Sequence, residues 1–158
     1  MDKVLCDQML GSLAKWLRLL GVDTLFITDS IEDDELVNIA IGEERILITR
    51  DKDLVIRAEK KRIPTIQIQS ADLTNQIETV LKNISIDENR FFSRCTLCNA
   101  PVKKVEKKSV KSKIPEKVFL NKDLFWYCSN CDKYYWKGSH YDKILDTISE
   151  IIMKKYGN

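Results

Sequence analysis

The chain has 158 residues, of which 44% are hydrophobic, and its formal net charge is +2. This length and apolar content suit one ordinary globular domain with a small appendage and argue against a disordered chain. No apolar run approaches the roughly 18 residues of a membrane span, and the first residues lead into a strand rather than a signal peptide. We therefore expect a cytoplasmic protein with no membrane partner.

Charge is distributed unevenly along the chain. Residues 1–91 carry 12 Lys and Arg against 17 Asp and Glu, whereas residues 92–158 carry 14 against 7. An acidic first part and a basic second part suit a polyanionic substrate that one part holds and the other processes. Ordinary solvated surface gives similar counts, so charge alone leaves both interpretations open.

Strand and helix patterns alternate through the first half. A short apolar strand is predicted at residues 4–6, and leucines at helical spacing predict a helix over 10–20 that stops at Gly21. The alternation continues with strands at 24–27, 46–49 and 63–68, and with helices at 31–41, from 54 onward and at 72–81. This order predicts an α/β fold in which helices cover both faces of a parallel sheet.

Carboxylates follow the predicted strands. Asp7 comes after the first strand, Asp51 and Asp53 come after the third, and Asp33 lies at the start of the helix over 31–41. The carboxyl ends of parallel strands frame the ligand crevice of an open α/β sheet. Carboxylates without His or Cys favour a hard cation, Mg²⁺ or Mn²⁺, which can activate water for attack on a phosphodiester. Glycine-rich nucleotide-binding motifs do not occur.

Each acid also suits a purely structural role. Asp51 can be the N-cap of the helix that follows it, and residues 30–33 resemble a capping box. Acids in the first turn of a helix are favoured by the helix dipole. A single helix needs only one cap, so the grouping of Asp7, Asp51 and Asp53 at one predicted sheet edge weakens this interpretation without removing it.

Two Cys-x-x-Cys pairs mark the second half. Cys95 and Cys98 form the first pair, and Cys128 and Cys131 form the second. Four thiolates at this spacing predict one structural Zn²⁺ in a closed site, and the long separation implies an insertion between the pairs. A disulfide is the alternative, but it suits a reducing compartment poorly. The polar stretch before the first pair places the domain boundary near residue 90, between domains 1–90 and 91–158.

Basic and aromatic residues surround the second pair. Lysines between the two pairs can follow a phosphate backbone, or they can simply keep a loop soluble; they include Lys103, Lys104, Lys107 and Lys108. Residues 133–140 mix lysines with aromatic side chains, among them Trp136, that can stack on unpaired bases or cover a thin core. A final helix is predicted over 141–156.

Three stretches of the first half carry a longer pattern: Asp7-x-Met9-Leu10-Gly11-x-Leu13-Ala14-x-Trp16-Leu17-Arg18-x-Leu20-Gly21-x-Asp23, Asp33-x-Glu35-Leu36-x-x-x-Ala40 and Leu47-x-Thr49-Arg50-Asp51. Together with the cysteine pairs, this pattern resembles the Mut7-C ribonuclease domain, a branch of the PIN-like nucleases. The resemblance implies divalent-metal-dependent hydrolysis of RNA, with Asp7, Asp33 and Asp51 as ligands of Mg²⁺ or Mn²⁺.

The same resemblance suggests roles for further residues. Asp53 matches an acid common in related PIN-like groups and is a fourth candidate catalytic residue. Arg18 and Arg50 match basic positions that meet phosphate. His140 matches the end of the family's ribbon, where it is a candidate RNA-facing group. We therefore predict a PIN-like nuclease joined to a Cys₄ zinc ribbon that assists RNA binding.

Two other functions remain open at this point. One is a non-catalytic RNA- or ribosome-binding adaptor, in which the acids serve only as helix caps. The other is the toxin half of a toxin–antitoxin pair, against which the added ribbon argues mildly. Metal binding at the acids discriminates the enzyme from the adaptor, because an adaptor need hold only zinc.

Overall fold

The computed structural model describes residues 2–157, except for the side chains of His140, Ile144, Lys155 and Tyr156. The chain divides into two compact units, residues 1–99 and residues 100–158. Within the part of the chain that is described, no helix is both long enough and apolar enough to cross a membrane.

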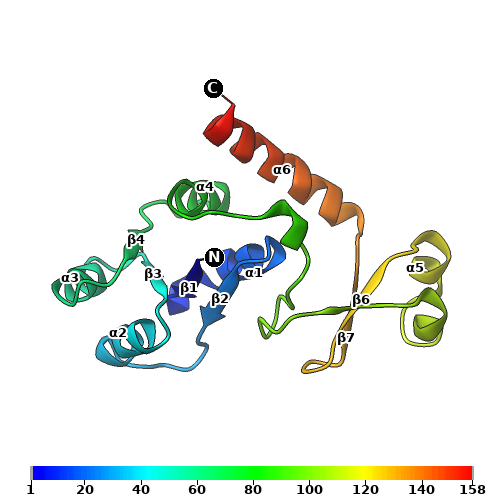
Figure 1. Cartoon of the computed structure of the whole chain (residues 1–158), viewed down its shortest axis with the longest axis horizontal. Coiled ribbons are helices and arrows are strands. Elements are labelled where there is room, and N and C mark those ends of the chain that lie inside the picture. The colour runs from blue at the N-terminus through cyan, green and yellow to red at the C-terminus, as the bar shows by residue number, and fades with distance from the viewer. Residues whose placement is uncertain (1, 158) are drawn as a thin grey trace. The chain divides into compact units, whose positions relative to one another are not determined.

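A parallel four-stranded sheet forms the centre of the first unit (Figure 1). Its strands are β1 (Lys3–Cys6), β2 (Asp23–Phe26), β3 (Ile46–Thr49) and β4 (Thr65–Gln67), in the order β2-β1-β3-β4. The register places Leu5 between Leu25 and Leu47. Short runs of buried aliphatic residues are typical of parallel strands that are covered on both faces. The predicted α/β fold with a parallel sheet is confirmed.

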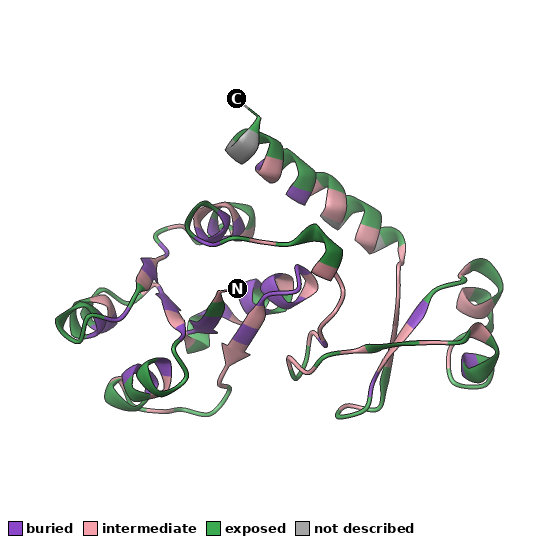
Figure 2. Ribbon diagram, in the orientation of Figure 1, coloured by how far each residue is buried: buried purple, intermediate pink, exposed green. Residues whose placement is uncertain are grey.

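Helices cover both faces of this sheet. They are α1 (Gly11–Leu19), α2 (Asp33–Gly42), α3 (Lys52–Lys60) and α4 (Leu73–Asn83). Helix α1 contacts α4, and α2 contacts α3, so each pair covers one face (Figure 1). The buried stripe of each helix points toward the strands (Figure 2). The core under α2 and α3 consists of Leu5, Leu36, Val37, Ala40, Leu47, Leu54, Ala58 and Ile63.

The first helix differs in one detail from the prediction. Its first turn is a separate 3₁₀ helix, η1 (Gln8–Leu10), with Asp7 as N-cap. At the other end of α1, Gly21 has a φ of 77°, and a Cβ at this position would overlap the carbonyl oxygen of Arg90. Only glycine permits both features at low cost. The amide of Phe92 also donates to the carbonyl of Leu19 (2.8 Å), so the stretch after η2 (Glu88–Arg90) packs on the end of α1.

The second unit contains a three-stranded antiparallel sheet. Its strands are β5 (Lys103–Val105), β6 (Phe125–Cys128) and β7 (Lys133–Trp136), in that order. The expected insertion lies between β5 and β6 and consists of η3 (Lys107–Val110) and α5 (Glu116–Asn121). The predicted C-terminal helix is α6 (Ser139–Tyr156), in which Ile148 and Ile151 are buried.

Candidate functional site

Asp7 and Asp51 lie at the carboxyl ends of two neighbouring strands. Asp7 follows β1, Asp51 comes two residues after β3, and the amide of Asp7 donates to the carbonyl of Ile48 (2.9 Å). In the sheet, β2 lies on one side of β1 and β3 lies on the other. The strand order therefore reverses between β1 and β3. Open α/β sheets bind their ligands at this point. The two acids therefore occupy the expected position for chemistry.

Thr49 joins the two acids through hydrogen bonds. Its hydroxyl donates to Asp7 Oδ2 (2.8 Å) and accepts from the backbone amide of Asp51 (2.9 Å). Thr49 itself is fully buried at the end of β3. No role for Thr49 was predicted from the sequence, although a hydroxyl residue at the end of an apolar strand, directly before the acidic turn, is a signal that could have indicated one. The hydrogen bonds fix the orientation of the Asp7 carboxylate.

Both acids also act as helix caps. Asp51 Oδ1 accepts from the amides of Asp53 (2.8 Å) and Leu54 (3.3 Å) at the start of α3, and Asp7 Oδ1 accepts from the amide of Gln8. The capping interpretation of Asp51 is thus confirmed. Capping does not exclude a second role, because a carboxylate has two oxygens and about four lone-pair sites.

The other predicted acids are placed differently. Asp33 lies in the first turn of α2, where its carboxylate pairs with Arg57 of α3 (Nε to Oδ2, 3.7 Å). The same guanidinium contacts Asp34 (Nη1 to Oδ1, 3.2 Å). Asp53 is exposed in the first turn of α3. Arg57 was not singled out in the sequence; it links the acidic start of α2 to α3.

The four cysteines come together. Cys95, Cys98, Cys128 and Cys131 place their sulfur atoms within 4.8 Å of one another, and none of the four is joined in a disulfide. Sulfur atoms around a tetrahedral Zn²⁺ with bonds of about 2.3 Å lie roughly 3.8 Å apart, so this donor set fits one structural zinc ion. Among the described residues, only this group brings three or more potential ligands close enough to share an ion. Asp7, Asp33, Asp51 and Asp53 do not form such a group.

Arg18 supports the first cysteine pair instead of facing solvent. It is 4% exposed; Nε donates to the carbonyl of Thr24 (2.9 Å), and Nη1 donates to the carbonyls of Thr96 (3.0 Å) and Leu97 (2.9 Å). Burial lowers the pKa of Arg18, although the thiols of Cys6, Cys95 and Cys98 act in the opposite direction. In this placement Nε and Nη1 donate to backbone carbonyls, and contact of Arg18 with a phosphate stays a prediction.

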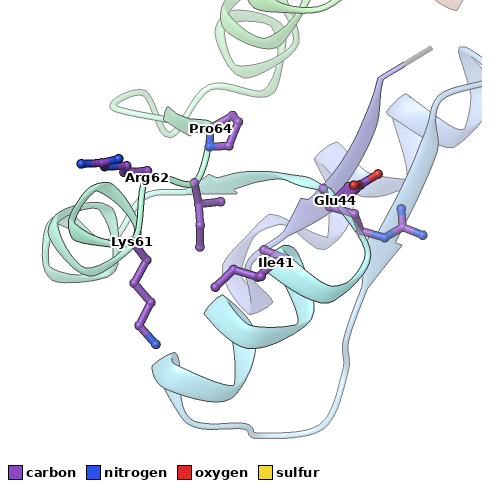
Figure 3. Close-up of a pocket in the computed structure, with 8 residues that line it drawn as sticks. Ile41, Glu44, Lys61, Arg62 and Pro64 are labelled. Carbon is purple, nitrogen blue, oxygen red and sulfur yellow. The ribbon is translucent and has the colours of Figure 1, made fainter.

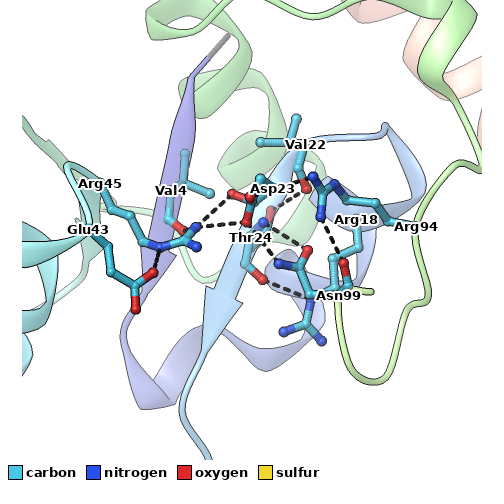
Figure 4. Close-up of polar contacts among 9 residues, drawn as sticks. All are labelled: Val4, Arg18, Val22, Asp23, Thr24, Glu43, Arg45, Arg94 and Asn99. Atoms are coloured by element: carbon cyan, nitrogen blue, oxygen red, sulfur yellow. Dashed lines mark hydrogen bonds and ion pairs between the residues drawn. The ribbon is translucent and has the colours of Figure 1, made fainter. Parts of the chain in front are cut away.

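Asp23 organises a second set of contacts beside Arg18 (Figure 4). Its Oδ1 accepts from Arg45 Nη1 and from Asn99 Nδ2, both at 2.8 Å, and Arg94 Nη2 lies 3.5 Å from Oδ2. Burial by itself raises the pKa of Asp23, but the hydrogen bonds from Arg45 and Asn99 and the nearby positive charges outweigh it, so the pKa lies below its ordinary value. This network holds the backbone around the first cysteine pair to β2.

The remaining predicted positions are spread over both units. Arg50 is half-buried next to Asp51. Lys103, Lys104 and Lys108 are exposed, whereas Lys107 pairs with Asp123 (2.9 Å). Trp136 is half-buried in β7, and the side chain of His140 lies outside the described residues.

One pocket of about 360 Å³ lies in the first unit, away from the acids (Figure 3). Its lining residues come from the ends of α2 and α3 and from the stretches that precede β3 and β4. It therefore opens at the amino-terminal edge of the sheet, opposite the edge that carries Asp7 and Asp51. Its lining consists of Ala40, Ile41, Glu44, Arg45, Lys61, Arg62, Ile63 and Pro64.

The first unit is a parallel α/β sheet with acids at its switch point, and four cysteines that could hold one zinc ion come together. The model of the Mut7-C RNase domain matches residues 2–148, and the chain belongs to this family of nuclease-type domains. It is also similar to the exonuclease mut-7 homolog of Homo sapiens, with 32% identity over 101 residues. The match covers 61% of this chain and 12% of that protein.

Proposed function

We propose that the chain is a divalent-metal-dependent ribonuclease that hydrolyses RNA phosphodiesters. The observation that carries the proposal is the pair of acids, Asp7 and Asp51, joined by Thr49 at the switch point of a parallel sheet. Membership of the Mut7-C RNase domain family supports the reaction class. Residues 1–90 would form the nuclease domain, and residues 91–158 would form a zinc ribbon that assists RNA binding.

Oxygen ligands suit a hard cation, and Asp7, Asp51 and Asp33 are the residues that would hold Mg²⁺ or Mn²⁺. When bound, such an ion supplies an acidified water and neutralises charge on the leaving oxygen. The protein's own contribution is positional. Thr49 keeps the Asp7 carboxylate oriented toward the sheet edge, and the α3 cap restrains Asp51. Arg50 would bind the phosphate next to Asp51.

A cleavage assay tests this proposal. Labelled single-stranded and structured RNAs are incubated with Mn²⁺ or Mg²⁺ and with native protein, Asp7→Asn, Asp51→Asn or Asp72→Asn. Asp72 is the matched control: it caps α4 through the amide of Asn75 (2.9 Å) and follows β4, two strands away from β1. Asparagine caps helices about as well as aspartate, so all three variants should fold and retain zinc.

We expect Asp7→Asn and Asp51→Asn to lose roughly 100-fold or more of the cleavage rate, and Asp72→Asn to keep it. Thr49→Val should lose about 10- to 100-fold, as for groups that orient metal ligands. Equal activity in native protein and Asp51→Asn would exclude the proposed site.

The second candidate function is a non-catalytic RNA- or ribosome-binding adaptor in the cytoplasm. It is favoured by the capping roles of Asp7 and Asp51 and by the absence, among the described residues, of a carboxylate group at ion-sharing distance. RNA binding by native protein without metal-dependent cleavage of any tested RNA would support this function.

A further inference from the structure

The sheet of the second unit has two faces that differ in how far they are covered by the rest of the unit. Side chains that are opposite each other on paired strands share a face, and successive side chains alternate. Lys104 pairs with Trp126, and Trp126 pairs with Tyr135, so these three form one row across the sheet. Lys133 shares this face with Tyr135, since the two are two residues apart on β7. We call this surface, together with the adjoining Lys137, the lysine–aromatic face.

The opposite face belongs to the fold of the unit. It carries Phe125, which is fully buried, and its cross-strand neighbours Val105 and Trp136. The row Lys103–Tyr127–Tyr134 lies on the same face, and the rings of its two tyrosines are 4.8 Å apart. Tyr134 also lies on this face, and Lys113 of the insertion sits 5.7 Å from its ring centroid. The insertion therefore covers part of this face. Trp136, the aromatic residue singled out in the sequence, is on the covered side.

Cations accompany the rings of the lysine–aromatic face. Lys133 Nζ lies 5.5 Å from the ring centroid of Tyr135, and Lys137 Nζ lies 6.0 Å from that of Trp126. Lys104 and Lys133 are exposed, whereas the two rings are half-buried. Asp123 and Asp142 line a pocket of about 290 Å³ together with Lys137. Asp132, which precedes Lys133, accepts from the hydroxyl of Tyr127 (2.9 Å). Asp123 is already paired with Lys107.

We propose that the lysine–aromatic face binds single-stranded RNA by stacking unpaired bases on Trp126 and Tyr135. Aromatic rings with flanking lysines are the combination that single-strand-binding proteins use, because rings accept any base and lysines follow the phosphates. A duplex has its bases already stacked and offers only its backbone. That the bound nucleic acid is RNA rests on the proposed function. The RNA-binding contribution of the second unit is thereby assigned to one face of its sheet.

The structure offers two matched pairs for the test. Tyr135 and Tyr134 are neighbours on β7 with opposite faces, as are Lys104 and Lys103 on β5. Fluorescence anisotropy measures binding of an unstructured 12-nucleotide RNA and of an RNA hairpin to the zinc-loaded chain of 158 residues. All proteins carry Asp51→Asn to prevent cleavage. Zinc content per chain reports folding of each variant.

Tyr135→Leu and Trp126→Leu should weaken binding of the unstructured RNA by about 5- to 100-fold, the range for loss of one stacked base. Tyr134→Leu should change affinity by less than about threefold, and Lys104→Gln should weaken binding more than Lys103→Gln. Hairpin affinity should change little in the ring variants. If a leucine variant fails to hold zinc, the comparison of Lys104→Gln with Lys103→Gln carries the test.

Several outcomes would overturn the proposal: unchanged affinity of zinc-loaded Tyr135→Leu, equal effects of Lys103→Gln and Lys104→Gln, or equal loss for unstructured RNA and hairpin. Its failure is separable from failure of the nuclease proposal. Cleavage that is lost in Asp51→Asn but unchanged in Trp126→Leu and Tyr135→Leu would refute the binding face alone. Face-dependent binding without any metal-dependent cleavage would refute the nuclease alone.

Discussion

At the scale of single residues, two glycines, Gly21 just after α1 and Gly42 at the end of α2, stand under opposite constraints. Gly21 has a positive φ and lies against the Arg90 carbonyl, whereas a Cβ at Gly42, the last residue of α2, has nothing within 4 Å. We expect Gly21→Ala to lower the free energy of unfolding by more than about 1 kcal/mol and Gly42→Ala to leave it unchanged or raise it by up to about 1 kcal/mol. Urea unfolding measures both.

The two glycines also test the packing of the connection against α1. Equal stability of Gly21→Ala and native protein would mean that the stretch at residue 90 does not approach α1 as closely as described. Gly42→Ala controls for the general effect of removing a glycine from the unfolded chain.

Single residues also show where sequence-based interpretation stops. Asp7 and Asp51 could be placed from the sequence because each follows a short apolar run, and the ends of parallel strands meet at one edge. The buried position of Arg18 could not be predicted, because a basic residue on a helix is normally expected to face solvent. The carbonyl of Thr96 that accepts from it lies 78 residues later in the chain. Asp23 and Asn99 are likewise distant in sequence and bond only after folding.

At the scale of elements, the clustering of the two cysteine pairs predicts that the chain binds one zinc ion. Cys98→Ser should reduce the zinc content from one ion per chain to almost none, because it removes one of four clustered thiols. Cys6→Ala is the control. Cys6 is fully buried in β1, and burial raises the pKa of its thiol to about 12, so it stays a neutral core group.

Zinc content is measured by atomic emission after gel filtration. Loss of zinc should also unfold the small sheet, since metal binding supplies folding energy in modules of this size. Loss of zinc in Cys6→Ala, or full zinc in Cys98→Ser, would contradict the Cys₄ assignment.

Elements with strong apolar patterns were predicted well. The strand at residues 46–49 matches β3, because four strand-forming residues, three of them buried, are followed at once by charged ones. The α1 prediction missed η1, since leucine spacing does not reveal that the cap at Asp7 closes a tighter turn. Neither η3 nor α5 was predicted. Their lysine-rich sequence lacks a periodic apolar stripe, and Val110 is the one residue of η3 that is buried.

At the scale of the whole molecule, the uneven charge predicts a salt-dependent affinity for RNA. The second part of the chain carries an excess of seven positive charges, and the first part an excess of five negative charges. Affinity of the native chain for single-stranded RNA should fall as salt rises, and Lys104→Gln should reduce the slope of log affinity against log salt by about 0.7. RNA-binding titrations at salt concentrations from about 50 to 200 mM, the range in which phosphate contacts weaken, measure this slope.

Lys122→Gln is a suitable comparison for this slope, since Lys122 lies outside the lysine–aromatic face, at the C-cap of α5. A slope that Lys104→Gln leaves unchanged would mean that this lysine does not neutralise a phosphate.

The double role of Asp51 has a consequence for experiments in living cells. Its carboxylate closes α3 as well as lying at the candidate catalytic edge. Replacement by alanine would cost about 1 kcal/mol of cap energy, and losses of 1–2 kcal/mol can change protein abundance several-fold through proteolysis. A phenotype of Asp51→Ala would therefore combine missing chemistry with fewer molecules. Asparagine, which keeps the cap, is the substitution that separates the two in a genetic test.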